Sequence, residues 1–190
     1  DYNIGSHDPF SAMALGWADP FIPNKDGDEI TIGTFQKTND VILLTPQMNS
    51  VPSPFDEYIL IELYSPTGLN EFDTLYQYKD NYPKGPNAVG IRLWHVDARL
   101  CTYTGDTPTM EPYAGVSGHN YVYLAMSNTY YGNQGRDYLS PYGRSYADYN
   151  VLQLIKNRTA ATYRENYAFS SNDMFYSGST FDMTTYGSQF

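Results

Sequence analysis

The residues of this chain that could carry metal or acid–base chemistry are its three histidines, His7, His95 and His119. Zinc-binding helices of peptidases place two histidines four residues apart in a His-Glu-x-x-His motif, because that spacing puts both side chains on one helix face. The motif is absent from this sequence, and the three histidines are far apart along the chain. From the residues alone, we therefore expect no zinc site and no zinc-dependent catalysis in this chain.

His95 and Asp97 are the next candidates, because they lie two residues apart in a strand-like run. Residues two apart in a β-strand project from the same face, so the imidazole and the carboxylate would be neighbours. Such a pair can serve acid–base catalysis or supply half of a metal site. No Gly-x-Ser-x-Gly nucleophile motif accompanies it. We interpret the pair as structural, and an independent hydrolase that uses it is the least favoured alternative.

Calcium is the cation that the sequence favours. Asp26 and Asp28 flank Gly27, an arrangement that resembles a calcium-binding turn but falls short of a complete EF-hand loop. The same residues would equally suit a hairpin turn. Asn70, Glu71 and Asp73 form a similar cluster with a weaker pattern.

A helix is expected over residues 6–17. Ser6 can act as the N-cap, and Phe10, Met13 and Trp17 recur at the spacing of one helix face. Gly16 and the Asp19-Pro20 pair that follows can end the helix. The apolar face must pack on another part of the protein, or it would lead to self-association.

Strand patterns dominate the rest of the chain. A hairpin turn is expected at Asn39-Asp40, a short helix over 150–157, and loops over 66–87, 104–120 and 127–148. The expected strands cover residues 29–35, 41–44, 58–64, 89–100 and 121–126. The sequence thus predicts a mainly β fold of β-sandwich-like antiparallel sheets, with one N-terminal amphipathic helix and one short later helix.

Composition narrows the classes of function. The net charge is −10, and the 11 Lys and Arg residues are scattered, so a nucleic-acid partner is not expected. No apolar run is long enough for a transmembrane helix. Cys101 is the single cysteine, and we expect it to be a buried apolar residue rather than a nucleophile. The 20 tyrosines favour strands and half-buried surfaces.

Three phrases follow one another in a set order in the first half of the chain. They are Ser-His-Asp-Pro-Phe-Ser-Ala-Met-Ala-Leu-Gly-Trp at 6–17, Tyr-Ile-Leu-Ile-Glu at 58–62 and Gly-Ile-Arg-Leu-Trp-His-Val-Asp at 90–97. In this order they resemble the part of immune-inhibitor-A-type (M6-like) zinc metallopeptidases that follows the catalytic centre. The resemblance covers most of residues 1–100, is weaker at 150–157 and 169–181, and draws its specificity from the order of the phrases.

The resemblance implies that the zinc ligands and the catalytic Glu of the parent protein lie N-terminal to this chain. It implies that Asp1 follows a methionine turn and that Tyr2 lies near the parent's zinc. Residues 1–20 would then end the catalytic lobe, and residues 21–190 would form a β-rich supporting domain. Because the chain lacks an initiator Met and opens in mid-phrase, we expect it to be a piece of a longer protein.

The leading interpretation is therefore the C-terminal, non-catalytic part of a secreted bacterial zinc metallopeptidase. The parent would cleave protein or peptide substrates, zinc would belong to the parent, and this chain alone would be inactive. The alternative is a β-sandwich surface-binding module whose Tyr-rich loops, at 130–133 and 138–143, recognise carbohydrate or protein.

Overall fold

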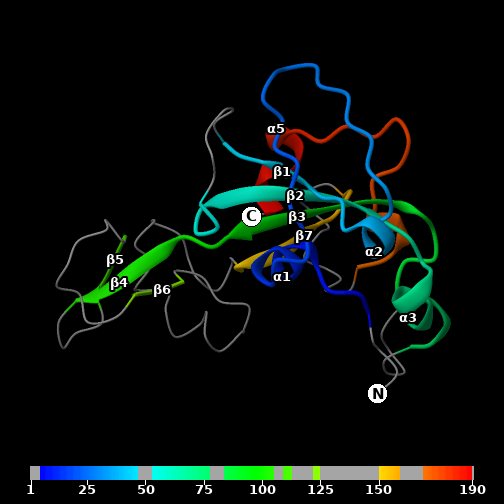
Figure 1. Cartoon of the computed structure of the whole chain (residues 1–190), viewed down its shortest axis with the longest axis horizontal. Coiled ribbons are helices and arrows are strands. Elements are labelled where there is room, and N and C mark those ends of the chain that lie inside the picture. Colours follow the sequence, from blue (N-terminus) through cyan, green and yellow to red (C-terminus); the bar gives the residue numbers. More distant parts are fainter. Residues whose placement is uncertain are drawn as a thin grey trace. The chain divides into compact units, whose positions relative to one another are not determined.

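The computed structural model describes residues 5–46, 53–77, 84–104, 109–112, 122–124, 150–158 and 169–189, and at 102–104, 109–112 and 122–124 it describes the backbone alone. Its elements can be followed in Figure 1. Tyr2 and the Tyr-rich segments at 130–133 and 138–143, which the sequence singled out, lie outside the described residues.

Four strands form an open antiparallel sheet in the order β1-β2-β3-β7. They are β1 (Ile42–Leu44), β2 (Glu57–Tyr64), β3 (Gly90–Asp97) and β7 (Leu152–Ile155). A second sheet, in the order β5-β4-β6, contains β4 (Leu100–Thr104), β5 (Thr109–Pro112) and β6 (Val122–Leu124). The expected antiparallel sheets are confirmed, whereas several short helices make the class mixed α/β rather than mainly β.

The internal contacts divide the chain into two units. The first comprises residues 1–44, 59–94 and 154–189, and the second comprises residues 45–58, 95–153 and 190. The core of the first unit includes Phe35, Leu43, Leu60, Leu93 and Met174, and that of the second includes Tyr58, Val96, Ala98, Cys101 and Val151. The burial of Cys101 confirms its expected role as a small apolar residue. The domain boundary expected at residue 20 stays a prediction.

The N-terminal helix is shorter than the sequence pattern suggested. Helix α1 covers Pro9–Ala14, and Asp8 is its N-cap in place of Ser6, since the Asp8 carboxylate accepts bonds from the Ser11 amide and hydroxyl. At the other end, Gly16 adopts a left-handed conformation (φ 71°), and its N–H donates to Met13 while that of Trp17 donates to Ala12. These two bonds form a Schellman motif, which ends the helix before Trp17.

Three other expectations are wrong. Residues 29–35 are not a strand, because the Gly33 N–H donates to the Asp40 carboxylate at 2.7 Å and Phe35 begins helix α2 (Phe35–Thr38). Asn39 ends that helix in a left-handed conformation (φ 57°) and is not in a hairpin turn. Residues 150–157 contain strand β7 instead of a helix, since a four-residue apolar run fits either period and pairing with β3 supplies its hydrogen bonds.

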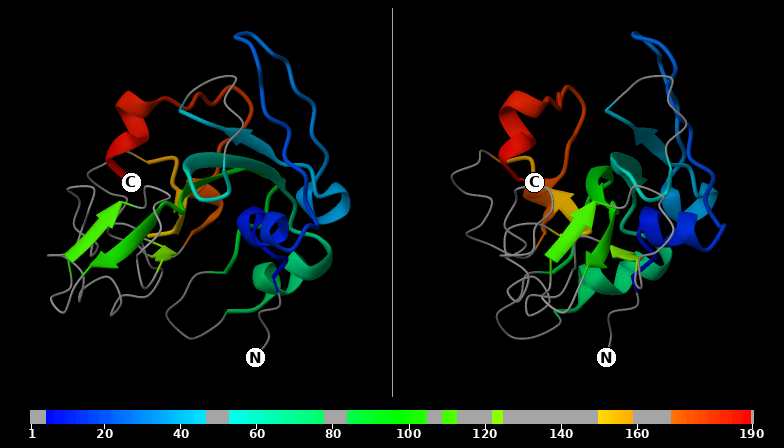
Figure 2. Two further views of the ribbon diagram at one scale, coloured as in Figure 1. Left: turned by 60° about the vertical axis from the view of Figure 1, so that its left-hand side comes forward. Right: turned by 90° about the vertical axis from the view of Figure 1, so that its left-hand side faces the viewer.

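The loop expected over 66–87 contains a 3₁₀ turn, η1 (Gly68–Asn70), followed by helix α3 (Glu71–Leu75). The last described segment contains η3 (Ser171–Asp173), α5 (Met183–Tyr186) and η4 (Gly187–Gln189). Figure 2 shows this segment in orange and red. Phe175 forms an antiparallel bridge with Ile91 of β3, so the C-terminal segment is tied to the sheet of the first unit.

Candidate functional site

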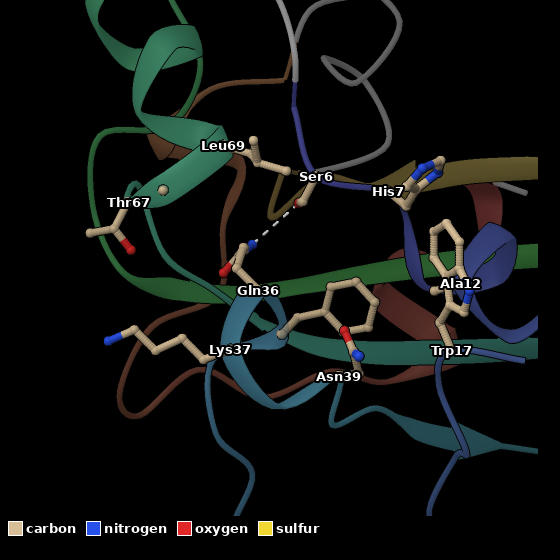
Figure 3. Close-up of a pocket in the computed structure, with 11 residues that line it drawn as sticks. Ser6, His7, Ala12, Trp17, Gln36, Lys37, Asn39, Thr67 and Leu69 are labelled. Carbon is tan, nitrogen blue, oxygen red and sulfur yellow. Dashed lines mark hydrogen bonds between the residues drawn. The ribbon is translucent and has the colours of Figure 1, made fainter.

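A pocket of about 490 Å³ is hollowed into the first unit (Figure 3). Its lining comes from three stretches that are distant in sequence: the start and end of the α1 region, helix α2 with its cap, and the turn at η1. The lining residues are Ser6, His7, Ala12, Trp17, Phe35, Gln36, Lys37, Asn39, Thr67, Gly68 and Leu69. This volume lies within the range of natural small-molecule sites.

The apolar part of the pocket combines buried and exposed side chains. Phe35 and Ala12 are each only 2% exposed, whereas Trp17 is 54% exposed. The His7 ring meets the Trp17 indole edge to face, with 5.1 Å between ring centroids. Such a contact favours this orientation of the indole, by about 0.5–1.5 kcal/mol for an aromatic pair.

Hydrogen bonds between polar side chains hold the three stretches together. The amide and hydroxyl of Ser6 both donate to Asn70 Oδ1 at 3.0 Å, and Asn70 Nδ2 donates to the Ser65 carbonyl. Gln36 Nε2 donates to Ser6 Oγ at 3.5 Å, the bond drawn in Figure 3, and Gln36 Oε1 accepts from the Ser65 amide. The side chains of Ser6 and Gln36 therefore use their hydrogen-bonding groups to connect the pocket walls.

Lys37 and Asn39 differ from these residues. Both are exposed, and among the described residues neither side chain has a hydrogen-bond or ion-pair partner. None of the lining residues is Asp or Glu, although the chain contains 21 acidic residues. The pocket thus presents donors and one fixed positive charge in a strongly acidic protein.

A buried polar cluster lies on β2 and β3 of the same unit. The side chain of Glu62 is fully buried, and its Oε1 accepts hydrogen bonds from Arg92 Nε and Trp94 Nε1, each at 2.7 Å. Arg92 Nη2 lies 2.6 Å from the same oxygen. The Arg92 guanidinium also sits over the Tyr64 ring, 4.4 Å from its centroid. All the hydrogen bonds that Arg92 and Trp94 donate to Glu62 therefore go to the same oxygen, Oε1.

The other oxygen, Glu62 Oε2, is buried and has no partner among the described residues, and the same holds for Asp73 Oδ1. Burial raises the pKa of Glu62, and the charge of Arg92 and the bond from Trp94 oppose this shift only in part. Burial likewise raises the pKa of Asp73. Burial also raises the pKa of Tyr64 to about 12, although Arg92 opposes the shift.

In the second unit, His95 and Asp97 are both buried, at 2% and 0% exposure. His95 Nε2 lies 3.0 Å from Glu57 Oε1, and Asp97 receives a two-pronged bond from Arg99, with Nε 2.7 Å from Oδ1 and Nη2 2.6 Å from Oδ2. Arg99 Nη1 also lies 3.2 Å from Glu57 Oε2. His95 is thus paired with Glu57, and Asp97 with Arg99; the sequence pattern indicated neither partner.

The expected calcium turn lies in the first unit. Gly27 has a left-handed conformation (φ 80°), and Asp28 Oδ1 lies 3.6 Å from the Lys25 ammonium. Asp26 is exposed. Throughout the described part of the chain, no three His, Cys, Asp or Glu side chains are grouped so that they could hold a metal ion. Calcium at Asp26 and Asp28 stays a prediction.

No described helix is both long and apolar enough to cross a membrane. Comparisons with protein-family models, with curated proteins and with solved structures each found no match.

Sequence reasoning missed the pocket and the role of Glu62. The pocket depends on α2, but the alternating pattern of residues 29–35 predicted a strand that runs into this helix. The available signal was Asn39, because Asn after Lys37 and Thr38 is a residue type that can end a helix. For Glu62, the signal was a charged residue inside the apolar run 58–64, since such a residue must be paired when the strand is buried.

Proposed function

We propose that this chain is the C-terminal, non-catalytic part of a secreted bacterial M6-like zinc metallopeptidase. In the parent protein, a zinc-activated water and a Glu general base would hydrolyse peptide bonds of protein substrates. The zinc ligands would come from a preceding lobe, and this chain would support that lobe. The chain by itself is expected to be catalytically silent.

The observation that carries this proposal is the meeting of the three resemblance phrases around Glu62. Glu62 belongs to the second phrase, and its two donors, Arg92 and Trp94, belong to the third. Asp8 of the first phrase is close enough for its charge to add to the raised pKa of Glu62. Phrases that are far apart in sequence therefore serve one buried structure, which gives a physical reason for their occurring together.

The surface of the first unit also suits a supporting role. Leu15, Trp17 and Phe21 follow the start of α1 and are each about half exposed. A catalytic lobe packed against this region would remove their apolar surface from water. Without such a lobe, we expect the chain to self-associate through the Phe10, Met13 and Trp17 region, where Phe10 and Met13 are already half-buried.

The test is to express the complete reading frame that encodes this chain and compare it with the 190-residue chain. We expect the long protein to cleave casein, to lose that activity with a zinc chelator and to regain it when zinc is restored. The matched control replaces the Glu of its His-Glu-x-x-His motif by Gln, which should abolish cleavage without unfolding the protein. A reading frame without that motif, or a long protein that is inert with zinc, would overturn the proposal.

A surface-binding module is the second candidate. Two antiparallel sheets, of four and three strands, are the parts from which a β-sandwich is built, and the exposed Trp17 beside a pocket is an arrangement used in recognition. This reading predicts that the 190-residue chain, without any further lobe, binds polysaccharides or cell-surface protein in a pull-down. Binding lost on removal of the tyrosines at 130–133 and 138–143 would assign it to the Tyr-rich loops.

A further inference from the structure

We propose that the pocket between α1, α2 and η1 binds an organic carboxylate with an aromatic or branched apolar body. The carboxylate would lie beside Lys37 and Thr67, and the apolar body would lie against Trp17 and Phe35. The C-terminal residue of a peptide and a free aryl or alkyl carboxylic acid share this chemistry. The inference does not need the peptidase proposal, but it requires that neither a catalytic lobe nor a second copy of the chain covers Trp17.

The two ends of the pocket differ in chemistry. In Figure 3, His7 and Trp17 lie at one end, while Lys37 extends away from them toward the side on which Thr67 lies. One end therefore offers a flat apolar surface, and the other offers an ammonium beside the Thr67 hydroxyl, which shares a 2.9 Å hydrogen bond with the Ser65 hydroxyl. A ligand that is apolar at one end and charged at the other matches this arrangement better than one with uniform polarity.

The aromatic end is prepared before any ligand arrives. The edge-to-face contact with His7 holds the Trp17 indole, and the half-exposed ring leaves surface for a second apolar group. Phe35, the first residue of α2, also lines the pocket and is buried. Covering this exposed indole removes apolar surface from water without the entropic cost of first ordering the ring.

The charge of the ligand follows from the residues around the rim. Lys37 has no carboxylate partner among the described residues, and the pocket lining contains no Asp or Glu. The nearest acidic residue in the sequence, Asp40, accepts a hydrogen bond from the Gly33 amide instead of pairing with Lys37. An anionic group would find a counter-ion there, whereas a cationic ligand would meet only repulsion from Lys37.

Hydrogen bonding distinguishes a carboxylate from a neutral sugar. Sugars are typically held by side chains that both donate and accept, but Ser6 and Gln36 already use these groups to hold the pocket walls. The ammonium of Lys37 can only donate, whereas the amide of Asn39 can donate and accept. A ligand head that only accepts hydrogen bonds fits the ammonium.

The first probe is 3-phenylpropionate, titrated into the 190-residue chain and followed by the two indole N–H signals in a ¹H–¹⁵N spectrum. Trp17→Phe assigns the signal of Trp17, and Trp94, which is bonded to Glu62, serves as the internal reference. We expect the Trp17 signal to shift with a Kd of about millimolar, the range for so small a ligand. 3-Phenylpropanamide, which has the same shape without the charge, should bind about fivefold more weakly.

Two variants locate the binding groups. Lys37→Gln should weaken binding of the carboxylate about fivefold and leave that of the amide unchanged. Lys25→Gln is the matched control, because Lys25 is also an exposed lysine of the same unit but does not line the pocket. Equal affinities for carboxylate and amide, a Lys37→Gln variant that binds like the control, or an unmoved Trp17 signal would each overturn the proposal.

A pair of tripeptides separates the two sources of the carboxylate. Gly-Gly-Phe carries the carboxylate at its C-terminus, and Gly-Gly-Phe-amide lacks it. Tighter binding of Gly-Gly-Phe than of 3-phenylpropionate, with the same dependence on Lys37, assigns the pocket to peptide C-termini. Weaker binding of the tripeptide, with that dependence kept for 3-phenylpropionate, assigns it to free carboxylic acids.

Discussion

Glu57 and Glu62 belong to the same strand, β2, but they are held in contrasting ways. Glu62 is fully buried and gathers Arg92 and Trp94 on a single oxygen, so that its second oxygen has no partner among the described residues. Glu57 is 24% exposed and divides its two oxygens between His95 and Arg99. Glu62 and its partners belong to the first unit of the chain, and Glu57 and its partners belong to the second.

The difference between the two carboxylates shows where the stability of the protein depends on a single counter-ion. A fully buried carboxylate loses its hydration, and one counter-ion must compensate for that loss. A carboxylate that keeps contact with water loses less when a partner is removed, because solvent can take the partner's place. We therefore expect the Glu62 cluster to be the less tolerant of the two, although it contains fewer charged residues.

The largest effect is expected from Arg92→Met. Methionine keeps much of the packing over Tyr64 but removes the one cation that pairs with Glu62 among the described residues. Breaking a buried ion pair from one side costs about 3–5 kcal/mol of unfolding free energy. Urea denaturation measures this loss, with Lys25→Met as the control for removing a surface lysine charge, which should change the free energy by less than about 1 kcal/mol.

A loss no greater than that of the control would show that Glu62 tolerates burial without Arg92. If Arg92→Met does not fold, Arg92→Lys keeps the charge and loses only the fork-like geometry. That variant should then recover a folded protein of intermediate stability.

A smaller loss, of about 1–3 kcal/mol, is expected for Arg99→Met. Arg99 binds both Asp97 and Glu57. Asp97 is fully buried, but the side chains of Arg99 and Glu57 are each 24% exposed, so water can enter the space that Arg99 leaves. Glu57 also keeps its contact with His95. The same urea experiment ranks the two arginines, and a larger loss for Arg99→Met than for Arg92→Met would reverse the comparison.

Glu62→Gln is expected to change the unfolding free energy least of the three variants. Its effect is on how that free energy depends on pH. Because burial raises the pKa of Glu62 above its ordinary value of 4.5, the folded state favours the protonated carboxyl. The resulting stabilisation is complete below about pH 4.5 and is lost as the pH rises through the raised pKa. Glutamine cannot titrate, so the variant lacks this contribution to the slope.

The measurement is the difference in unfolding free energy between the parent chain and Glu62→Gln at several pH values from 4.5 to 8. Other titrating groups cancel in this difference, as long as they do not touch Glu62. We expect the stability of the parent relative to the variant to fall as the pH rises. A difference that is constant, or that grows with pH, would mean that Arg92 outweighs burial at this site.

The strands were easier to predict than the helices, for a physical reason. Residues 58–64 carry the apolar run that a buried strand requires and form a strand with nearly the expected ends, whereas the strand expected over 89–100 ends at Asp97 and Leu100 begins β4. The helices have four to six residues each, and caps such as Asp8 and Asn39 fix their ends more than periodicity does. Six residues are too few for the apolar spacing to outweigh a cap and a Schellman motif.

The candidate site could be predicted only in part. His95 and Asp97 are both buried, but their partners, Glu57 and Arg99, depend on pairing between strands and on a turn. The pocket depends on α2 folding back closely on the residue that precedes it by two positions, Gly33. A Cβ atom added at Gly33 would lie 2.6 Å from the methyl group of Thr38. Contacts between segments so far apart in sequence leave no pattern in either segment alone.

One consequence follows from Gln189, which is only 1% exposed. Its side-chain amide accepts from the Lys156 N–H at 2.8 Å and donates to the carbonyls of Lys156 and Arg158, at 2.7 and 3.1 Å. Strand β7 is the last in the order of its sheet, and Gln189 bonds to backbone groups directly beyond the end of that strand. Removing the last few residues would therefore break three hydrogen bonds of this buried side chain at once and loosen the chain where the strand ends.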